Sequence, residues 1–454
     1  MKITFLGGVE EVTGSKYLIE HGQTTLLVDC GLFQGIKENT RRNWDEQPFD
    51  PEKIDAIVLT HAHIDHTGYI PALVKQGFKG PIYCSRGTYE LCAILLLDSG
   101  RLQEEDAKRV NIRYEEAKNP KRIEPLYTEQ DARRSLEQFK VVDFQTPIDL
   151  GGALTATLIR SGHIIGSSFV VISDGTKKLT FSGDLGRPHQ LIMNPPTNIT
   201  QTDFLVIEST YGDRLHAEED AIEALGTIID TTVRKGGFVI IPSFAVGRTQ
   251  EVLYCLYQLK QQNKLPAIPI YLDSPMAIAV TDLFCQFREE MHLDPAVCEA
   301  MRHIATYSRT ADDSKAIDAS SGPAIIIAGS GMADGGRVIH HLDKFIADRK
   351  NTVVFVGFQA PGTPGRALVD GIKTIQIKGS AHTVHARIEL IHSLSAHADY
   401  SEILEWLSHF QNAPEKVFVT HGETQSAESL KQKIVERFGW TVIIPKYQES
   451  FELE

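Results

Sequence analysis

The chain has 454 residues, which points to two domains or to one domain with a large insertion. Its composition, 42% hydrophobic and 23% charged, is that of a globular protein. With 46 basic and 59 acidic residues its formal net charge is −13, which argues against nucleic-acid binding over the whole surface and requires any polyanion site to be local.

The first half reads as short strands and tight turns. Glycine or polar breaks separate predicted strands at residues 2–8, 15–20, 24–31 and 56–60. A helix at 69–77 and a strand at 81–85 follow. Residues 88–140 are helical in pattern with nearly balanced charges, which indicates a solvated face rather than an RNA track. Strands then return at 141–144, 153–159, 168–173, 177–183 and 203–210.

From residue 211 strands and helices alternate, as in a parallel α/β sheet. The strands of this part are predicted at 238–243, 269–274, 324–330 and 352–358. The last part adds strand-like runs, a helix at 401–411, a strand at 416–422, a helix at 427–439 and a strand at 441–445. We therefore predict a first domain at 1–210, an inserted domain at 211–375, and the completion of the first domain at 376–454.

The six cysteines occur singly, without a CxxC pair. This pattern indicates neither a zinc ribbon nor a disulfide scaffold, and we expect buried, reduced thiols in a cytoplasmic protein. No apolar run approaches the roughly 20 residues of a membrane span, so no membrane association is expected.

The segment THAHIDHTG, residues 60–68, follows directly on the apolar run DAIVL. His61 and His63 are two apart, so in an extended segment they point to the same side. Asp65 and His66 follow on the turn into a helix. Imidazole and carboxylate ligands at the end of a strand suit zinc, with manganese or iron as alternatives.

Three further metal-capable residues also come just after apolar strands and beside glycine. They are His163 in SGHIIGSS, Asp184 in SGDLGR and His421 in THGE. Together with HxHxDH they indicate a metal centre assembled from distant parts of the chain.

These motifs, together with LVDCG, ESTYGDR and SAHAD, resemble those of the metallo-β-lactamase-fold hydrolases, and more narrowly of the β-CASP RNA-processing nucleases. The resemblance spans nearly the whole chain. It implies an α/β fold: an αββα metallo-β-lactamase sandwich with an inserted parallel α/β β-CASP domain.

The resemblance also implies the ligands of two zinc ions. His61, His63 and His163 would bind one ion, Asp65, His66 and His421 the second, and Asp184 both. Asp29 would steady the ligand loop. Two dications would more than offset the two aspartates and would favour an anionic phosphodiester.

Asp65, His397 and Glu208 are the candidate catalytic residues. In the family the position of His397 lies in the site, where it is proposed to protonate the leaving oxygen or to hold the scissile phosphate. Glu208 would orient His397 or a ligand imidazole. The implied reaction is RNA hydrolysis in a cleft between the domains, leaving a 5′-phosphate and a 3′-hydroxyl.

The inserted domain carries three glycine- or serine-rich loops between a strand and a helix. Backbone N–H groups at such helix starts suit phosphates. We expect RNA-backbone contacts from residues in these loops: Arg248, Ser330, Gly331, Arg337 and Arg366.

Two other functions use the same residues. One is a small-molecule metallohydrolase acting on a thioester or lactone; the long insertion argues against it. The other is a non-catalytic RNA-processing subunit, but such relatives have lost metal ligands that this chain keeps. Endonuclease is favoured over 5′ exonuclease, and a homodimer is left open.

Overall fold

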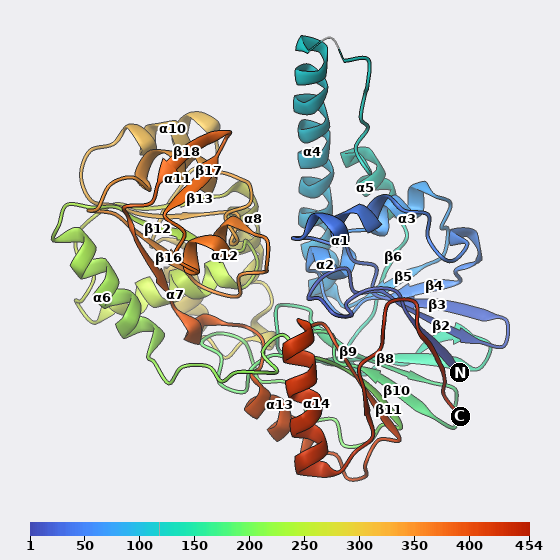
Figure 1. Cartoon of the computed structure of the whole chain (residues 1–454). Coiled ribbons are helices and arrows are strands. Elements are labelled where there is room, and N and C mark those ends of the chain that lie inside the picture. Colours follow the sequence, from blue (N-terminus) through green and yellow to red (C-terminus); the bar gives the residue numbers. More distant parts are fainter. Residues whose placement is uncertain (118) are drawn as a thin grey trace. The chain divides into compact units, whose positions relative to one another are not determined.

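The computed structural model describes residues 1–117 and 119–454, which form two compact units (Figure 1). The first unit comprises Met1–Pro188, Pro195–Leu215 and His397–Glu454, and the second comprises His189–Asn194 and His216–Ala396. The chain therefore leaves the first unit twice, once for a short excursion and once for a long insertion.

The first unit contains two seven-stranded sheets. In spatial order, one is built from β22 (Ser450–Glu452), β1 (Lys2–Phe5), β2 (Tyr17–His21), β3 (Thr24–Val28), β4 (Ala56–Val58), β5 (Ile82–Cys84) and β6 (Phe139–Val141). The other is built from β21 (Val442–Ile443), β20 (Lys416–Thr420), β11 (Phe204–Glu208), β10 (Lys178–Phe181), β9 (Ser168–Ser173), β8 (Leu154–Arg160) and β7 (Ile148–Gly151).

The two sheets pack face to face through alternate residues of their strands. Phe5 and Val28 of one sheet share a core with Phe181, Val206 and Phe418 of the other. The intervening residues of β11 and β20 pack outward against α13 and α14. Because β11 and β20 are covered on both faces, their central residues form continuous apolar runs, FLVI in β11 and VFV in β20.

Helices complete the αββα layering of the first unit (Figure 1). They are α1 (Lys37–Arg41), α2 (Ile64–Thr67), α3 (Ile70–Lys75), α4 (Arg86–Glu116), α5 (Glu129–Leu136), α13 (Tyr400–Leu407) and α14 (Thr424–Phe438). The charged segment predicted to be helical is α4, and its C-terminal half is mostly exposed. Within the described ranges no helix is both long and apolar enough to traverse a lipid bilayer.

The second unit is built on a six-stranded, entirely parallel sheet. Its order is β14 (Thr306–Tyr307), β13 (Ile270–Asp273), β15 (Ile325–Ala328), β12 (Val239–Pro242), β16 (Thr352–Phe355) and β19 (Arg387–Leu390). A separate hairpin pairs β17 (Thr374–Ile377) with β18 (Ser380–Thr383). The helices are α6 (Ala221–Val233), α7 (Arg248–Gln261), α8 (Pro275–Phe284), α9 (Pro295–Arg302), α10 (Ala311–Ala319), α11 (Val338–Phe345) and α12 (Pro364–Val369).

The boundaries of the insertion differ from those expected from the sequence. The run at 385–394 supplies β19, which pairs with β16, so the second unit extends to Ala396 rather than to residue 375. The excursion at 189–194 also belongs to this unit, because the backbone of Met193 pairs with that of Met291. Strand pairing between distant segments decides both boundaries, and local composition does not record it.

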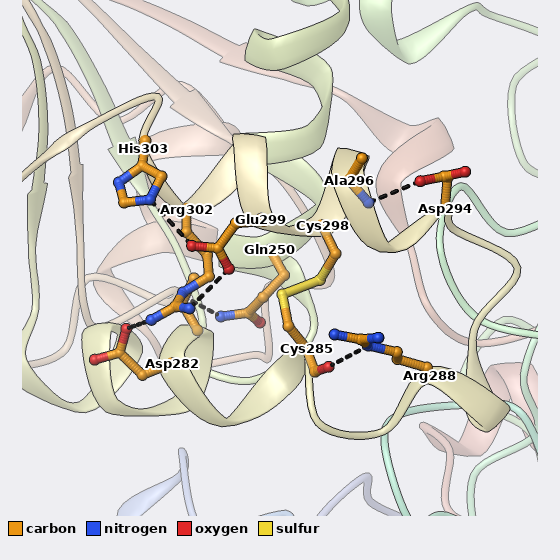
Figure 2. The surroundings of a disulfide bond; sticks show 11 residues. Gln250, Asp282, Cys285, Arg288, Asp294, Ala296, Cys298, Glu299, Arg302 and His303 are labelled. Carbon is orange, nitrogen blue, oxygen red and sulfur yellow. Dashed lines mark hydrogen bonds and ion pairs between the residues drawn. A yellow bond between two sulfur atoms is a disulfide. The ribbon is translucent and has the colours of Figure 1, made fainter.

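A disulfide joins Cys285, at the end of α8, to Cys298 in α9 (Figure 2). This corrects the expectation that all six cysteines are reduced. The turn between the two helices brings the Cα atoms to 5.9 Å, within the usual disulfide range. The other four cysteines are free and buried, as expected. In Figure 2, Arg302 of α9 lies between Glu299 and Asp282, so an ion-pair network accompanies the covalent link.

Candidate metal centre

The predicted ligands of the first unit gather at the carboxyl ends of its strands. His61 follows β4, His163 follows β8, Asp184 follows β10 and His421 follows β20 directly. In the second sheet β10, β11 and β20 are parallel, and β8 runs in the same direction because it is antiparallel to β9, as β10 is. Their carboxyl ends therefore share one edge.

One ligand group is formed by His61, His63, His163 and Asp184. Nε2 of His61 lies 3.0 Å and Nε2 of His163 lies 3.3 Å from Nδ1 of His63. Oδ2 of Asp184 lies 3.2 Å from Nε2 of both His61 and His163, and 4.0 Å from Nδ1 of His63. The four donor atoms thus surround one small volume.

A second group is formed by Asp65, His66 and His421, which come from α2 and the end of β20. Nε2 of His421 lies 3.2 Å from Nε2 of His66 and 3.3 Å from Oδ2 of Asp65. The second carboxylate oxygen of Asp184, Oδ1, lies 3.3 Å from Nε2 of His66. Asp184 therefore turns one oxygen toward each group.

The donor spacing fits bound cations. Tetrahedral bonds of 2.0–2.1 Å place neighbouring donors about 3.3 Å apart, close to most of the distances in both groups. Asp184 Oδ1 is buried and accepts no hydrogen bond from the described residues, a costly arrangement for a carboxylate unless a cation compensates it. The seven side chains could hold two divalent metals.

Asp29 and Thr60 fix the orientation of two of the imidazoles. Asp29 Oδ2 lies 2.7 Å from His66 Nδ1 and accepts the Thr60 hydroxyl at 2.7 Å. Thr60 Oγ1 lies 3.1 Å from His61 Nδ1. These contacts direct Nε2 of both rings toward the centre. Thr60 was not among the predicted site residues, although it stands immediately before HxHxDH.

Burial and neighbouring charges lower the pKa values of some site residues and raise those of others. Burial lowers the pKa of His61 to about 3 and holds that of His163 well below its ordinary value. Burial raises the pKa of Asp184, but the surrounding imidazoles, led by His421, bring it well below the usual range. For His66, burial lowers the pKa, while Asp184, Asp29 and a third carboxylate raise it well above normal. His61 and His163 are therefore neutral beside an ionised Asp184, the protonation states that metals require, whereas His66 must release a proton when it binds a cation.

His397 and Glu208 form a pair next to the ligands. Nδ1 of His397 lies 3.0 and 3.2 Å from the two oxygens of Glu208, whose Oε1 also accepts the N–H of Leu185 at 2.5 Å. Burial lowers the pKa of His397, but the charges of Glu208 and Asp184 raise it to about 9. The site is open where His63, Asp65 and His397 lie, with exposed side-chain fractions of 27%, 19% and 17%, while Glu208 is fully buried.

The predicted RNA contacts of the second unit have partners within the fold. Arg248 is buried and pairs with Glu251, three residues along α7. Arg337 donates to Asp273 Oδ1 at 2.6 Å and to the carbonyls of Ser308 and Arg309. Both guanidinium groups therefore have partners within the fold, although the Arg337 side chain is still 21% exposed.

Of the other three predicted contacts, Ser330 and Gly331 lie on the loop after β15, and Arg366 lies in α12, which follows β16. Arg366, half-buried, pairs with Asp370 at 3.0 Å. The hydroxyl of Ser330 is bonded to Asp334. Gly331 is buried against Phe244, whose ring leaves no room for a Cβ atom.

Comparison with known proteins extends these observations to the whole chain. The metallo-β-lactamase superfamily model matches residues 10–225 and the Beta-Casp domain model matches 249–368. A third model, the Zn-dependent metallo-hydrolase RNA specificity domain, matches 381–445. Ribonuclease TTHA0252 of Thermus thermophilus is 34% identical over 464 residues, covering 99% of both chains. The chain belongs to the β-CASP family of the metallo-β-lactamase superfamily.

A second curated relative and one solved structure are also similar to this chain. Transcription termination factor FttA of Methanosarcina mazei is 30% identical over 460 residues, covering 96% of this chain and 69% of that protein. A crystal structure of a protein of unknown function from Enterococcus faecalis V583 covers 100% of this chain with a TM-score of 0.53 at 13% identity, which shows the fold alone. The fold class and the family expected from the motifs are confirmed. The β-CASP chain is a hydrolytic nuclease with a divalent-metal site.

Proposed function

We propose that this β-CASP protein is a zinc-dependent ribonuclease that cuts RNA internally and leaves a 5′-phosphate and a 3′-hydroxyl. One observation carries the proposal: two groups of ligands share Asp184, and a Glu208–His397 pair lies beside them. A ribonuclease with 34% identity over 99% of the chain supports RNA as the substrate.

The residues proposed to hold zinc are His61, His63, His163, Asp65, His66, His421 and Asp184. Two zinc ions, when bound, would supply Lewis acidity at the phosphate and lower the pKa of a water molecule. The carboxylate of Asp184 sets the spacing of the two groups, because one oxygen faces each of them. Asp29 and Thr60 keep the imidazoles in the orientation that binding needs.

The remaining residues act on the leaving group. Glu208 accepts a hydrogen bond from Nδ1–H of His397, so Nε2–H carries the proton that the ring can donate. Water adds to phosphorus and releases one proton to solvent, the P–O3′ bond breaks, and O3′ takes the Nε2 proton. Solvent then returns a proton to His397. Asp65, at the open side of the site, accepts a hydrogen bond from the attacking water. His397 thereby replaces a poor alkoxide leaving group with an alcohol.

Cleavage of labelled RNA, with and without a chelator, tests the proposal. A circular RNA has no 5′ end, so its cleavage establishes endonuclease action and its survival beside degraded linear RNA establishes exonuclease action. Extension of the products by a polymerase that requires a 3′-hydroxyl checks the bond that was broken. Thioester and lactone substrates test the alternative function. If they are hydrolysed while RNA stays intact, the protein is a small-molecule hydrolase and the proposal is wrong.

A further inference from the structure

The loop between β1 and β2, residues 6–16, lies against the second ligand group. The carbonyl of Gly8 accepts the backbone N–H of His421 at 2.6 Å, and the N–H of Ser15 donates to the carbonyl of Asp65 at 2.8 Å. One loop thus joins the main chains of two ligands that are 356 residues apart. His61, His63 and His163 are held by other segments: Ser168 N–H bonds the Thr60 carbonyl, and Ser167 Oγ accepts from His163 N–H.

His421 depends on such support because of its backbone conformation. Its φ is +48°, in the left-handed region that side chains other than glycine rarely occupy. This conformation persists only where the surroundings impose it. Besides Gly8, the N–H of Ser209 bonds the His421 carbonyl at 3.1 Å, and Thr210 Oγ1 contacts both that carbonyl and Nδ1.

The loop closes tightly on itself. The N–H of Gly8 donates to the carbonyl of Thr13, and a Cβ atom at Gly7 would lie 1.8 Å from the carbonyl oxygen of Gly14. Its two ends therefore move together, and anything that fixes the tip also fixes Gly8 and Ser15.

Glu11 fixes the tip. Its Oε1 lies 3.2 Å from Nη1 of Arg42, and its Oε2 lies 2.9 Å from Nδ2 of Asn39 and 3.1 Å from Thr13 Oγ1. The guanidinium of Arg42 in turn lies over the rings of Phe33 and Tyr447. The side chain of Glu11 is 11% exposed, so its charge is partly shielded from water and its ionic contacts keep more of their strength.

We propose that Glu11 is a positioning residue for the metal held by Asp65, His66 and His421. It clamps the β1–β2 loop to the segment 39–42, and the loop sets the backbones of Asp65 and His421. Loss of the clamp lowers the affinity for that metal ion. The affinity for the ion at His61, His63 and His163 stays unchanged. The inference rests on the two-metal centre proposed above.

Neighbouring residues provide a matched pair of variants. Burial raises the pKa of Glu11 to about 7, so the variants are compared at pH 8. There Glu11→Gln and Glu10→Gln each remove one negative charge from the same loop, but the side chain of Glu10 is exposed. Titration of metal-free protein with Zn²⁺ against a chromophoric chelator gives two affinities, and Co²⁺ absorption spectra report each environment. Glu11→Ala should weaken one site by about 10- to 100-fold, the range for partners of metal ligands. Glu11→Gln should lie between Glu11→Ala and wild type, and Glu10→Gln should match wild type.

The outcomes separate this inference from the proposal it rests on. A wild-type protein that binds fewer than two ions refutes the two-metal centre itself. Two wild-type sites that Glu11→Ala leaves unchanged, or weakens equally, overturn the role of Glu11 alone. Melting temperature and circular dichroism identify misfolding. If Glu11→Ala misfolds, the test rests on Glu11→Gln. Unchanged metal affinities in Glu11→Gln would then overturn the positioning role of Glu11.

Discussion

Replacing Glu208 by glutamine tests the proposed proton donor. Both oxygens of Glu208 lie within 3.2 Å of His397 Nδ1, and the side chain is fully buried. Glutamine keeps the length and an oxygen for the Leu185 N–H but removes the charge that favours the protonated ring. A hydrogen bond to a charged group contributes about 1.5–3 kcal/mol, so the cleavage rate should fall about 10- to 150-fold.

Single-turnover cleavage of end-labelled RNA measures this rate without product release. A second substrate carries sulfur in place of the 3′ bridging oxygen. Because a thiolate leaves without protonation, the defect of Glu208→Gln should shrink on it. The control is Glu405→Gln, which removes a 67% exposed carboxylate paired with Arg437. Equal rates for Glu208→Gln and wild type on the oxygen substrate, with metal content unchanged, would refute the reasoning.

Three further predictions address the metals, the disulfide and the second unit. Asp184→Asn should lower the affinity for both metal ions by more than roughly 100-fold, measured by elemental analysis after dialysis, because its oxygens face both groups. Reduction of Cys285–Cys298, which are 13 residues apart, should cost about 3 kcal/mol and lower the melting temperature. Burial lowers the pKa of His341, but hydrogen bonds with Asp273 and a second aspartate raise it above 6.5. Its stabilisation is therefore complete below pH 6.5 and is lost as pH rises through the folded value, which urea unfolding between pH 6 and 9 should record.

Each of these has a control. Full occupancy of both sites in Asp184→Asn would remove its bridging role. The Cys285→Ser/Cys298→Ser protein should melt at the same temperature with and without reductant, and an equally insensitive wild type with an intact bond would contradict the prediction. His341→Gln should lose part of the pH dependence of stability; an unchanged slope would assign that dependence to other groups.

The predicted ligands lie close together because each of them follows a strand end. The four residues of HxHxDH are close in the sequence, so their spacing alone predicts that they lie near one another. His163, Asp184 and His421 are distant, yet each follows an apolar run, and parallel strands bring such residues to one edge. The sequence does not show that Asp184 divides its oxygens between the groups, or that Thr60 orients His61, because both depend on side-chain direction.

Side-chain and strand pairing that composition does not record accounts for the differences between expectation and structure. Arg248 follows a glycine-containing loop as a phosphate ligand would, but α7 places Glu251 beside it. The segment between α8 and α9 brings Cys285 next to Cys298. Because the cysteines occur singly in the sequence, this pairing could not be predicted from their spacing. The run containing β19 is a plausible strand for either unit, and only its pairing with β16 assigns it.

The separation of the ligands along the chain has a consequence during translation. His66 and His421 meet in one ligand group although they are 355 residues apart along the chain. At 5–20 residues per second, a ribosome needs about 20–70 s to go from one to the other. Throughout that interval the emerging polypeptide lacks the histidine that completes the second group. If cleavage requires both ligand groups, as proposed, the nascent chain cannot cut the messenger that encodes it until synthesis has passed β20.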